Sequence, residues 1–211
     1  MIKKKFFITI EGCDGSGKTT HCLFLKKYIK QKCYDVMLTR EPGGTICSEV
    51  IRKILLDPKF NLVPLTELFL YEAARAQHVK EVIIPSLNLN KVVICDRFFD
   101  TTIAYQGYGR KLDLKFIDKL NSIASYGIIP DLTIYFDIES SYGIDIARKS
   151  NSKYKNFGDR MERESIEFYN NVRKGYLINA KKNSKRIKIV KVKKTIVSTQ
   201  KLVKKIVDMV L

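Results

Sequence analysis

The 211-residue sequence is poor in the side chains from which metal centres and disulfide frameworks are built. It has two histidines, His21 and His78, which lie far apart in the chain. None of its five cysteines forms a CxxC pair: Cys13, Cys22, Cys33, Cys47 and Cys95. A zinc site therefore has almost no ligands to draw on, and an odd number of scattered cysteines is typical of free thiols in a reducing compartment. We expect a cytoplasmic protein without a zinc site.

Long apolar runs, internal repeats and low-complexity linkers are also missing. No stretch approaches the roughly eighteen apolar residues that a membrane-spanning helix requires. The lysines at 3–5 and the apolar run Phe6–Ile10 imitate a signal peptide, but the run is short and Glu11 and Asp14 follow it. We therefore expect no membrane association and a single domain over residues 1–211, which is long enough to fold around its own core.

The charge is far from balanced, because 39 Lys and Arg against 22 Asp and Glu give a formal net charge of +17. Such a surface attracts anions, so nucleotides, nucleic acid and acidic lipid are candidate partners. Lys, Ile, Asn, Tyr and Phe are all plentiful, as an AT-rich genome would produce, so the charge alone identifies none of these partners. The basic residues are densest at 181–205 and are not interleaved with aromatic residues that stack bases. We expect no nucleic acid among the partners.

Short apolar runs alternate with longer helix-like segments along the chain. The expected strands are Phe6–Ile10, Val36–Thr39, Val92–Cys95, Leu132–Phe136 and Ile187–Val192. The expected helices are Lys18–Lys32, Ser48–Leu56, Leu65–Ile84, Leu114–Ser125, Tyr142–Lys149, Ser165–Asn183 and Thr199–Val210. This alternation predicts an α/β fold with a doubly wound, five-stranded parallel sheet flanked by helices. Ligands of such folds bind at the carboxyl ends of the strands.

The strongest motif is a P-loop that runs from Gly12 to Thr20 and matches G-x-x-x-x-G-K-[ST]. It follows an expected strand and opens an expected helix, which is the context that the motif requires. Its glycines allow backbone N–H groups to surround phosphate oxygens at a helix N-terminus. Lys18 can then reach the β- and γ-phosphates, and the Thr19 hydroxyl can bind Mg²⁺. The motif predicts a nucleoside triphosphate site.

Charged residues also follow two other expected strands. Asp96 ends the apolar run 92–95 in the manner of a magnesium-binding carboxylate, and Arg97 beside it can clamp phosphoryl oxygens. The alternative is a structural Asp–Arg pair that caps the strand. Arg40 stands at the base of a Pro-Gly-Gly loop, where it is either a ligand for a second phosphate-bearing substrate or an exposed loop arginine.

Residues 149–163 have the composition of a lid. Their polar, Ser- and Asn-rich part carries Lys153 and Lys155 between two expected helices. Arg148 and Arg160 flank this part, and a lid arginine that stabilises the transferring phosphoryl group contributes about 10³–10⁵ in rate. For the two lysines a solvated charge run is the preferred interpretation.

Six motifs in the same order make the chain similar to thymidylate kinases of the bacterial type over nearly its whole length. They are the P-loop, Arg40–Thr45, Ala73–His78, Asp96–Phe98, Ala104–Gly107 and Asp159–Glu162. The resemblance implies a P-loop kinase fold with a short lid, a homodimer, and Mg²⁺-dependent transfer of the ATP γ-phosphoryl group to dTMP, giving dTDP for dTTP synthesis. Gly15 stands where one class of the family carries a catalytic arginine, which favours the class with that arginine in the lid.

The resemblance also implies a role for each matching residue. Catalysis falls to Lys18, Arg97 and Arg160, and magnesium binding to Thr19 and Asp96. The ATP-binding residues are Gly12, Cys13, Asp14, Gly15, Ser16, Gly17, Lys18, Thr19, Thr20 and Arg148. The dTMP-binding residues are Asp14, Arg40, Tyr71, Arg75, Arg97, Thr102, Tyr105 and Gln106.

Within the dTMP set, the resemblance gives the Asp14 carboxylate to the sugar 3′-hydroxyl and gives Tyr71 and Arg75 to thymine. Tyr105 would crowd the 2′ position and so favour deoxyribose. Two arginines for the acceptor favour a monophosphate over a nucleoside. Two alternatives stay open at this point: a P-loop kinase for another nucleotide, and a P-loop ATPase that binds nucleic acid.

Overall fold

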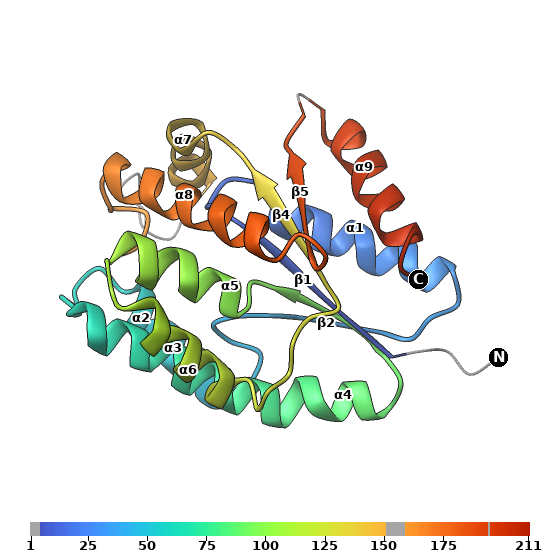
Figure 1. Ribbon diagram of the computed structural model, residues 1–211, viewed down its shortest axis with the longest axis horizontal. Coiled ribbons are helices and arrows are strands. Elements are labelled where there is room, and N and C mark those ends of the chain that lie inside the picture. Colours follow the sequence, from blue (N-terminus) through green and yellow to red (C-terminus); the bar gives the residue numbers. More distant parts are fainter. Residues whose placement is uncertain (1–4, 151–158, 194) are drawn as a thin grey trace.

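The computed structural model describes residues 5–150, 159–193 and 195–211. A sheet of five parallel strands crosses its centre (Figure 1): β1 (Phe6–Gly12), β2 (Val36–Arg40), β3 (Val92–Asp96), β4 (Leu132–Asp137) and β5 (Ile187–Lys191). Their spatial order is β2-β3-β1-β4-β5, so the chain extends the sheet outward from β1 in both directions. The expected doubly wound α/β fold is confirmed, and each expected strand overlaps an observed one.

The helices and helix-like segments that connect the strands are α1 (Lys18–Gln31), α2 (Ile46–Leu56), α3 (Pro64–His78), η1 (Val79–Ile83), α4 (Ile84–Asn88), α5 (Phe99–Thr102), η2 (Ile103–Gly109), α6 (Leu114–Ala124), α7 (Ser140–Ser150), α8 (Ile166–Lys182) and α9 (Ile196–Asp208). The segments η1 and η2 are π-helical. Each expected helix is found, although the third changes to π-helical geometry at η1 before α4 continues it. The elements α5 and η2 were not expected. Among the described residues, no helix is both long and apolar enough to cross a membrane.

Side-chain caps fix where several helices begin. The Thr45 hydroxyl accepts a hydrogen bond from the Ser48 N–H at the start of α2, and the Ser165 hydroxyl accepts one from the Phe168 N–H at the start of α8. Each such cap contributes about 1 kcal/mol, because it satisfies an N–H group that has no partner inside the helix.

The two faces of the sheet are covered by different helices (Figure 1). On one face, Leu25 of α1 and Val203 of α9 pack against strand residues such as Ile8. On the other face, α8 packs against β4 and β5, and its Tyr176 stacks on Tyr135 of β4 with 4.7 Å between ring centroids. Burial of each large side chain stabilises the fold by about 1.5–3 kcal/mol. Coverage on both faces explains why β1, β3 and β4 are buried along nearly their whole length.

The parallel register brings the ends of three neighbouring strands to one level. Arg40 at the end of β2 lies beside Asp96 of β3, and Ile10 of β1 lies beside Asp96 on the other side. Because the P-loop begins two residues after Ile10, it reaches the same edge of the sheet as Arg40 and Arg97. The convergence that the sequence predicts is therefore observed.

Candidate active site

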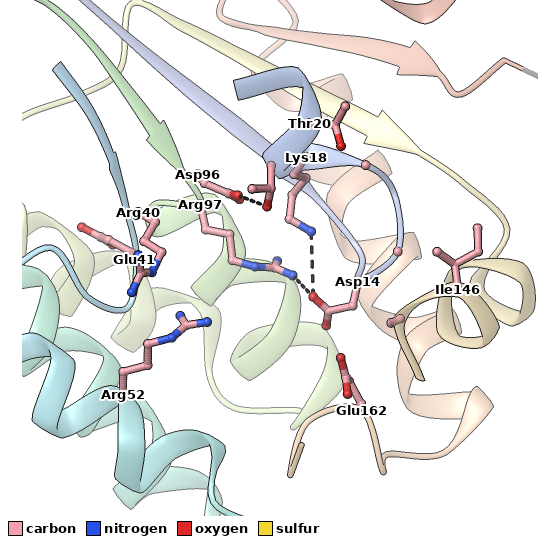
Figure 2. Close-up of a pocket in the computed structure, with 14 residues that line it drawn as sticks. Asp14, Lys18, Thr20, Arg40, Glu41, Arg52, Asp96, Arg97, Ile146 and Glu162 are labelled. Carbon is pink, nitrogen blue, oxygen red and sulfur yellow. Dashed lines mark hydrogen bonds and ion pairs between the residues drawn. The ribbon is translucent and has the colours of Figure 1, made fainter. Parts of the chain in front are cut away.

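A cavity of about 340 Å³ opens at this edge, between the P-loop and α2 (Figure 2). The described residues that line it are Asp14, Gly15, Gly17, Lys18, Thr19, Thr20, Arg40, Glu41, Arg52, Asp96, Arg97, Ile146, Ala147 and Glu162. Most of them are predicted site residues. Figure 2 shows Arg40 and Arg52 on one side of the pocket, and Lys18 and Asp14 of the P-loop on the other, with Arg97 reaching between them.

The P-loop has a backbone that only glycine adopts easily. Gly15 and Gly17 have φ angles of 74° and 82°, in the left-handed region. A Cβ added to Gly15 would lie 2.0 Å from the carbonyl oxygen of Gly143 in α7, so this position has no room for a side chain. The Ser16 hydroxyl is buried and has no hydrogen-bond partner within the described part of the chain. It is an unpartnered donor within an anion-binding loop, which fits a phosphate ligand.

Lys18 is buried at the start of α1. Its Nζ donates to the Cys13 carbonyl oxygen over 2.9 Å and lies 3.8 Å from the Asp14 carboxylate. Burial, together with the guanidinium of Arg97, holds the pKa of Lys18 below its ordinary value, whereas Asp14 opposes this effect. A poorly solvated ammonium group interacts strongly with an anion, because little water screens the two charges.

Arg97 and Asp14 form the central ion pair of the cavity, with 2.5 Å between Nη2 and Oδ1. Arg97 also donates to the Gly12 carbonyl oxygen over 2.9 Å and lies over the Tyr105 ring at 5.1 Å. Burial alone would raise the pKa of Asp14, but Arg97 and Lys18 hold it below its ordinary value. The φ angle of Arg97 is 71°, which costs about 1–3 kcal/mol in a residue other than glycine. Such backbone strain is frequent at functional sites.

Two further arginines line the cavity. Arg40 is half exposed and pairs with both carboxylate oxygens of Glu49, at 2.8 and 2.9 Å. Arg52 of α2 donates to the Pro42 carbonyl oxygen over 2.9 Å. Sequence reasoning missed Arg52, although an arginine inside the apolar run of α2, just after the Arg40 loop, was a usable signal.

Thr19 and Asp96 present two oxygen donors side by side. The Thr19 hydroxyl donates to Asp96 Oδ2 over 2.9 Å, and both residues line the cavity (Figure 2). A hydroxyl and a carboxylate at this spacing suit Mg²⁺, which prefers oxygen ligands and keeps several waters. The residues present therefore fit the predicted magnesium site.

A second group of metal-ligand types, Glu41, His78 and Cys95, is buried with its ligand atoms within 4.8 Å of one another. Both ring nitrogens of His78 are already in hydrogen bonds, with Glu41 at 2.9 Å and Thr39 at 2.6 Å. The other Glu41 oxygen accepts from Arg75, and burial holds the pKa of the Cys95 thiol well above its ordinary value. This group is a hydrogen-bond network rather than a metal site.

Arg75 lies behind the cavity wall in a closed network. It is 2% exposed and donates to carbonyl or carboxylate oxygens of Glu41, Glu72 and Asn121 and to the hydroxyl of Thr102. Glu41 lines the cavity, so it connects Arg75 to the space where a ligand can bind.

The other predicted base-site residues also lie outside the lining of this cavity. Tyr71 is half buried on α3, and the burial of its hydroxyl raises its pKa. Gln106 of η2 is buried and donates from Nε2 to Glu67 over 2.7 Å. Its Oε1 has no hydrogen-bond partner among the described residues, so it is left as a free acceptor. The structure brings Arg75 and Thr102 together, and it attaches Gln106 to a separate carboxylate.

Arg160 makes its side-chain contacts with α2 and α3 rather than with the P-loop. Its Nη1 bonds to the fully buried Glu67 at 2.6 Å, and its Nε donates to the Leu55 carbonyl oxygen over 2.7 Å. Arg160 is not among the described residues that line the cavity. The predicted lid, 149–163, is described only in part, and the side chain of Arg148 lies outside the described residues.

A larger cavity of about 760 Å³ lies on the other side of the P-loop. Its described lining is Gly15, Ser16, Gly17, His21, Asp137, Ile138, Glu139, Tyr142, Ile146, Arg173, Lys191, Val192, Lys193, Ile196 and Thr199. Arg173 bonds to both Asp137 oxygens, at 2.7 and 3.2 Å. Sequence reasoning missed this cavity, although most of its charged residues end or directly follow β4 and β5 and so stand at the edge where ligands bind.

A P-loop with a cavity on each side, and three arginines facing its lysine, has the arrangement of a kinase that holds two phosphate-bearing substrates. The fold and the site thus define a P-loop kinase.

Comparison with known proteins identifies the family. A family model described as Thymidylate kinase matches residues 10–203. The thymidylate kinase of Pelotomaculum thermopropionicum is 46% identical over 186 residues, which is 87% of this chain and 84% of that protein. That of Geobacillus sp. is 43% identical over 196 residues, 92% of this chain and 91% of the relative. The crystal structure of thymidylate kinase from Ehrlichia chaffeensis superimposes with a TM-score of 0.79 at 36% identity, covering 97% of this chain and 99% of the other. The chain belongs to the thymidylate kinase family.

Proposed function

We propose that the central cavity is where this kinase transfers the γ-phosphoryl group of ATP to dTMP, producing dTDP and ADP. Phosphorylation of dTMP by ATP is the activity of the family to which the chain belongs. The observation that carries the proposal for the site is the cavity itself, in which Lys18 of the P-loop faces Arg40, Arg52 and Arg97.

On the donor side, the P-loop residues Gly12–Thr20 hold the phosphates of ATP. The free hydroxyl of Ser16 supports this assignment, because a phosphate oxygen would give it an acceptor. The 760 Å³ cavity beside Gly15 and Gly17 has room for the adenosine part of the donor. Arg148 remains a predicted ATP ligand.

Thr19 and Asp96 hold Mg²⁺ in this proposal. Bound there, the ion would neutralise charge that builds up on the donor phosphates. The hydrogen bond from Thr19 to Asp96 keeps both oxygens on the side of the cavity occupied by the P-loop.

On the acceptor side, the phosphate of dTMP is held by Arg40, Arg52 and Arg97. Guanidinium groups suit this task, since their paired N–H donors match two phosphate oxygens. The Asp14 carboxylate, with the Tyr105 hydroxyl 3.3 Å away, is placed for the sugar. The 3′-hydroxyl donates to Asp14, and Tyr105 fills the space that a 2′-hydroxyl would need.

The thymine ring is assigned to Tyr71, Arg75, Thr102 and Gln106. The free Oε1 of Gln106 supports this, because it can accept a hydrogen bond from the N–H group that thymine carries. A guanidinium N–H of Arg75 would donate a hydrogen bond to a carbonyl group of thymine.

The reaction requires little covalent chemistry from the protein. Phosphoryl transfer passes through a loose transition state, so the catalytic task is in-line positioning of the substrates and neutralisation of charge on the transferring group. Lys18 contacts that group from the side of ATP, and Arg97 contacts it from the side of dTMP. We assign no general base.

We further propose a homodimer that forms through α2, α3 and α6, which pack side by side (Figure 1). Six large apolar side chains are exposed on these helices: Ile46, Val50, Leu65, Phe69, Phe116 and Ile123. The rings of Phe69 and Phe116 touch across two helices, with centroids 6.4 Å apart, so part of this surface is continuous. An exposed apolar patch of this kind marks an interface. Light scattering should give twice the chain mass, and a monomer would refute this proposal.

The five free thiols support placing the enzyme in the cytoplasm, where cysteines stay reduced.

The first experiment is an ATP-consumption assay with Mg²⁺ and a panel of acceptors: dTMP, dUMP, dCMP, AMP, GMP and thymidine. Strong preference for dTMP is the expected outcome, and the matched Lys18→Ala protein should be inactive. Turnover of another monophosphate would contradict the base-site assignment but keep the kinase mechanism. ATP hydrolysis stimulated by DNA, without phosphorylation of any acceptor, would favour the nucleic-acid-linked ATPase instead.

A further inference from the structure

A ring of buried oxygens lies directly behind the guanidinium of Arg97. Glu11, the residue before the P-loop, is fully buried, and its Oε1 accepts the Phe98 N–H over 2.7 Å. Its Oε2 accepts from the Thr101 hydroxyl at 2.6 Å and from the Tyr176 hydroxyl at 2.9 Å. The two hydroxyl oxygens are themselves 2.8 Å apart. Three elements far apart in the sequence therefore meet at one carboxyl group.

The guanidinium of Arg97 contacts the two hydroxyl oxygens of this ring. Nη1 of Arg97 lies 3.4 Å from the Thr101 hydroxyl and 3.4 Å from the Tyr176 hydroxyl. The backbone is held as well, because the Phe98 N–H bonded to Glu11 belongs to the peptide that follows the left-handed residue Arg97. Both ends of Arg97 thus contact the ring formed by Glu11, Thr101 and Tyr176, in addition to the bonds of the guanidinium to Asp14 and to the Gly12 carbonyl oxygen.

The three oxygen–oxygen contacts of the ring share a small number of hydroxyl and carboxyl hydrogens. Each hydroxyl has one hydrogen, so an ionised Glu11 leaves two hydrogens for three oxygen–oxygen contacts, whereas a protonated carboxyl supplies the third. Burial and the neighbouring Asp100 carboxylate raise the pKa of Glu11 to about 7, although Arg97 opposes this. Asp100 is itself paired with Arg186 at 2.7 Å. Each member of the ring therefore contacts both of the others, so the loss of one hydroxyl changes the hydrogen bonds of the remaining two.

Tyr176 is the member of the ring that α8 contributes. It belongs to α8, which packs across β4 and β5 (Figure 1), and its ring stacks on Tyr135. It is 2% exposed and is not among the described residues that line either cavity beside the P-loop, so it does not touch a substrate bound there. Its hydroxyl acts only on Glu11, Thr101 and Arg97.

We propose that Tyr176 is a positioning residue for phosphate binding: through the buried ring with Glu11 and Thr101, its hydroxyl fixes the guanidinium of Arg97 in the orientation that receives the acceptor phosphate. This inference rests on the proposed function, in which Arg97 binds the phosphate of dTMP. It predicts that the hydroxyl matters for the phosphate and not for the nucleoside.

The test compares Tyr176→Phe with Tyr135→Phe by calorimetric titration with dTMP and with thymidine. Both changes remove one hydroxyl from the same pair of stacked rings, but the Tyr135 hydroxyl bonds to Asp137 at 3.3 Å and not to Arg97. Tyr176→Phe should raise the Kd for dTMP about threefold to tenfold, the range expected for one buried hydrogen bond, and leave the Kd for thymidine unchanged. Tyr135→Phe should change neither.

An unchanged Kd for dTMP in Tyr176→Phe would overturn the proposal. So would equal weakening of dTMP and thymidine, which indicates a structural role, or the same dTMP-selective loss in Tyr135→Phe. If Tyr176→Phe does not fold, Thr101→Val removes the neighbouring hydroxyl of the ring, and Thr101→Ser should restore the affinity for dTMP. Failure of Ser to restore it would again overturn the proposal. A wild-type protein that binds dTMP no more tightly than thymidine would instead refute the proposed role of Arg97, before any variant is compared.

Discussion

Arg97 and Arg160 are both arginines that the sequence assigns to the transferring phosphate, and both are mostly buried against a carboxylate. Their partners differ. Asp14, the partner of Arg97, is 26% exposed and lines the central cavity, whereas Glu67, the partner of Arg160, is fully enclosed. The first pair therefore lies where a ligand can reach it, and the second pair links α3 to the segment before α8 outside the lining of the cavity.

The surroundings of Glu67 explain this difference. It accepts hydrogen bonds from Gln106, Arg110 and Arg160, so it joins α3, η2 and the segment before α8. Burial alone would raise the pKa of Glu67, but these donors hold it below its ordinary value. A carboxylate surrounded by donors from three elements positions those elements. An arginine that opens onto a cavity positions a ligand.

The largest effect that separates the two arginines is expected for Arg97→Ala. Removal of the guanidinium that faces the P-loop should lower kcat/KM for dTMP about 10³-fold, as for other arginines that stabilise a transferring phosphoryl group. Arg97→Lys keeps the charge but loses the paired N–H donors, so it should recover only part of the loss. Steady-state kinetics measures both variants. Full activity in Arg97→Ala would remove this residue from the site.

A smaller effect is expected for Arg160→Ala. Arg160 and Gln106 both bond to Glu67, so the loss of Arg160 should disturb Gln106 during turnover, and Gln106 is one of the residues assigned to thymine. The KM for dTMP should then rise about tenfold to hundredfold, with kcat within about threefold of wild type. Glu67→Gln, which removes the other charge of the pair, should shift KM in the same direction. A kcat loss of about 10³ with unchanged KM would instead establish the catalytic role that the sequence predicts.

The contrast between Arg97 and Arg160 also shows how much of the site could be predicted from the sequence. Asp96, Arg97 and Arg40 stand at strand ends next to recognisable motifs, and parallel pairing alone brings strand ends together, so their convergence was predictable. The contact between Arg160 and Glu67 joins residues 93 positions apart and depends on how α3 packs, which no local pattern records. The π-helical segment η2 was missed for a similar reason. Its sequence, IAYQGYG, contains two glycines and no helical period, and packing against α8 holds it in place.

Tyr105→Ala should change substrate choice by a more modest factor. The Tyr105 ring lies under Arg97 and its hydroxyl lies 3.3 Å from Asp14, beside the proposed position of the sugar. Loss of the ring should reduce the preference for dTMP over its ribonucleotide counterpart about fivefold, since a steric contact with one hydroxyl contributes little more. The ratio of the two kcat/KM values in one variant is the measurement, because any loss of folded protein cancels in it. An unchanged ratio would take Tyr105 away from the 2′ position.

The smallest effect is expected for Cys13, in the enclosed region around Arg97 and Asp14. A thiol at a helix N-terminus is often reactive, because the helix dipole stabilises the thiolate. Here burial and the Asp14 carboxylate raise the pKa of Cys13 to about 12, against the opposing effect of Lys18. At pH 8 almost none of it is thiolate, so iodoacetamide should label the exposed Cys33 and Cys47 and leave Cys13 intact, as peptide mass spectrometry can show. Cys13→Ala should accordingly keep kcat within about twofold, since the thiol acts as a small apolar residue. Rapid labelling of Cys13, with loss of activity that ATP prevents, would contradict this prediction. It would mean that the region around Cys13, Arg97 and Asp14 opens to solvent far more than its burial in the structure allows.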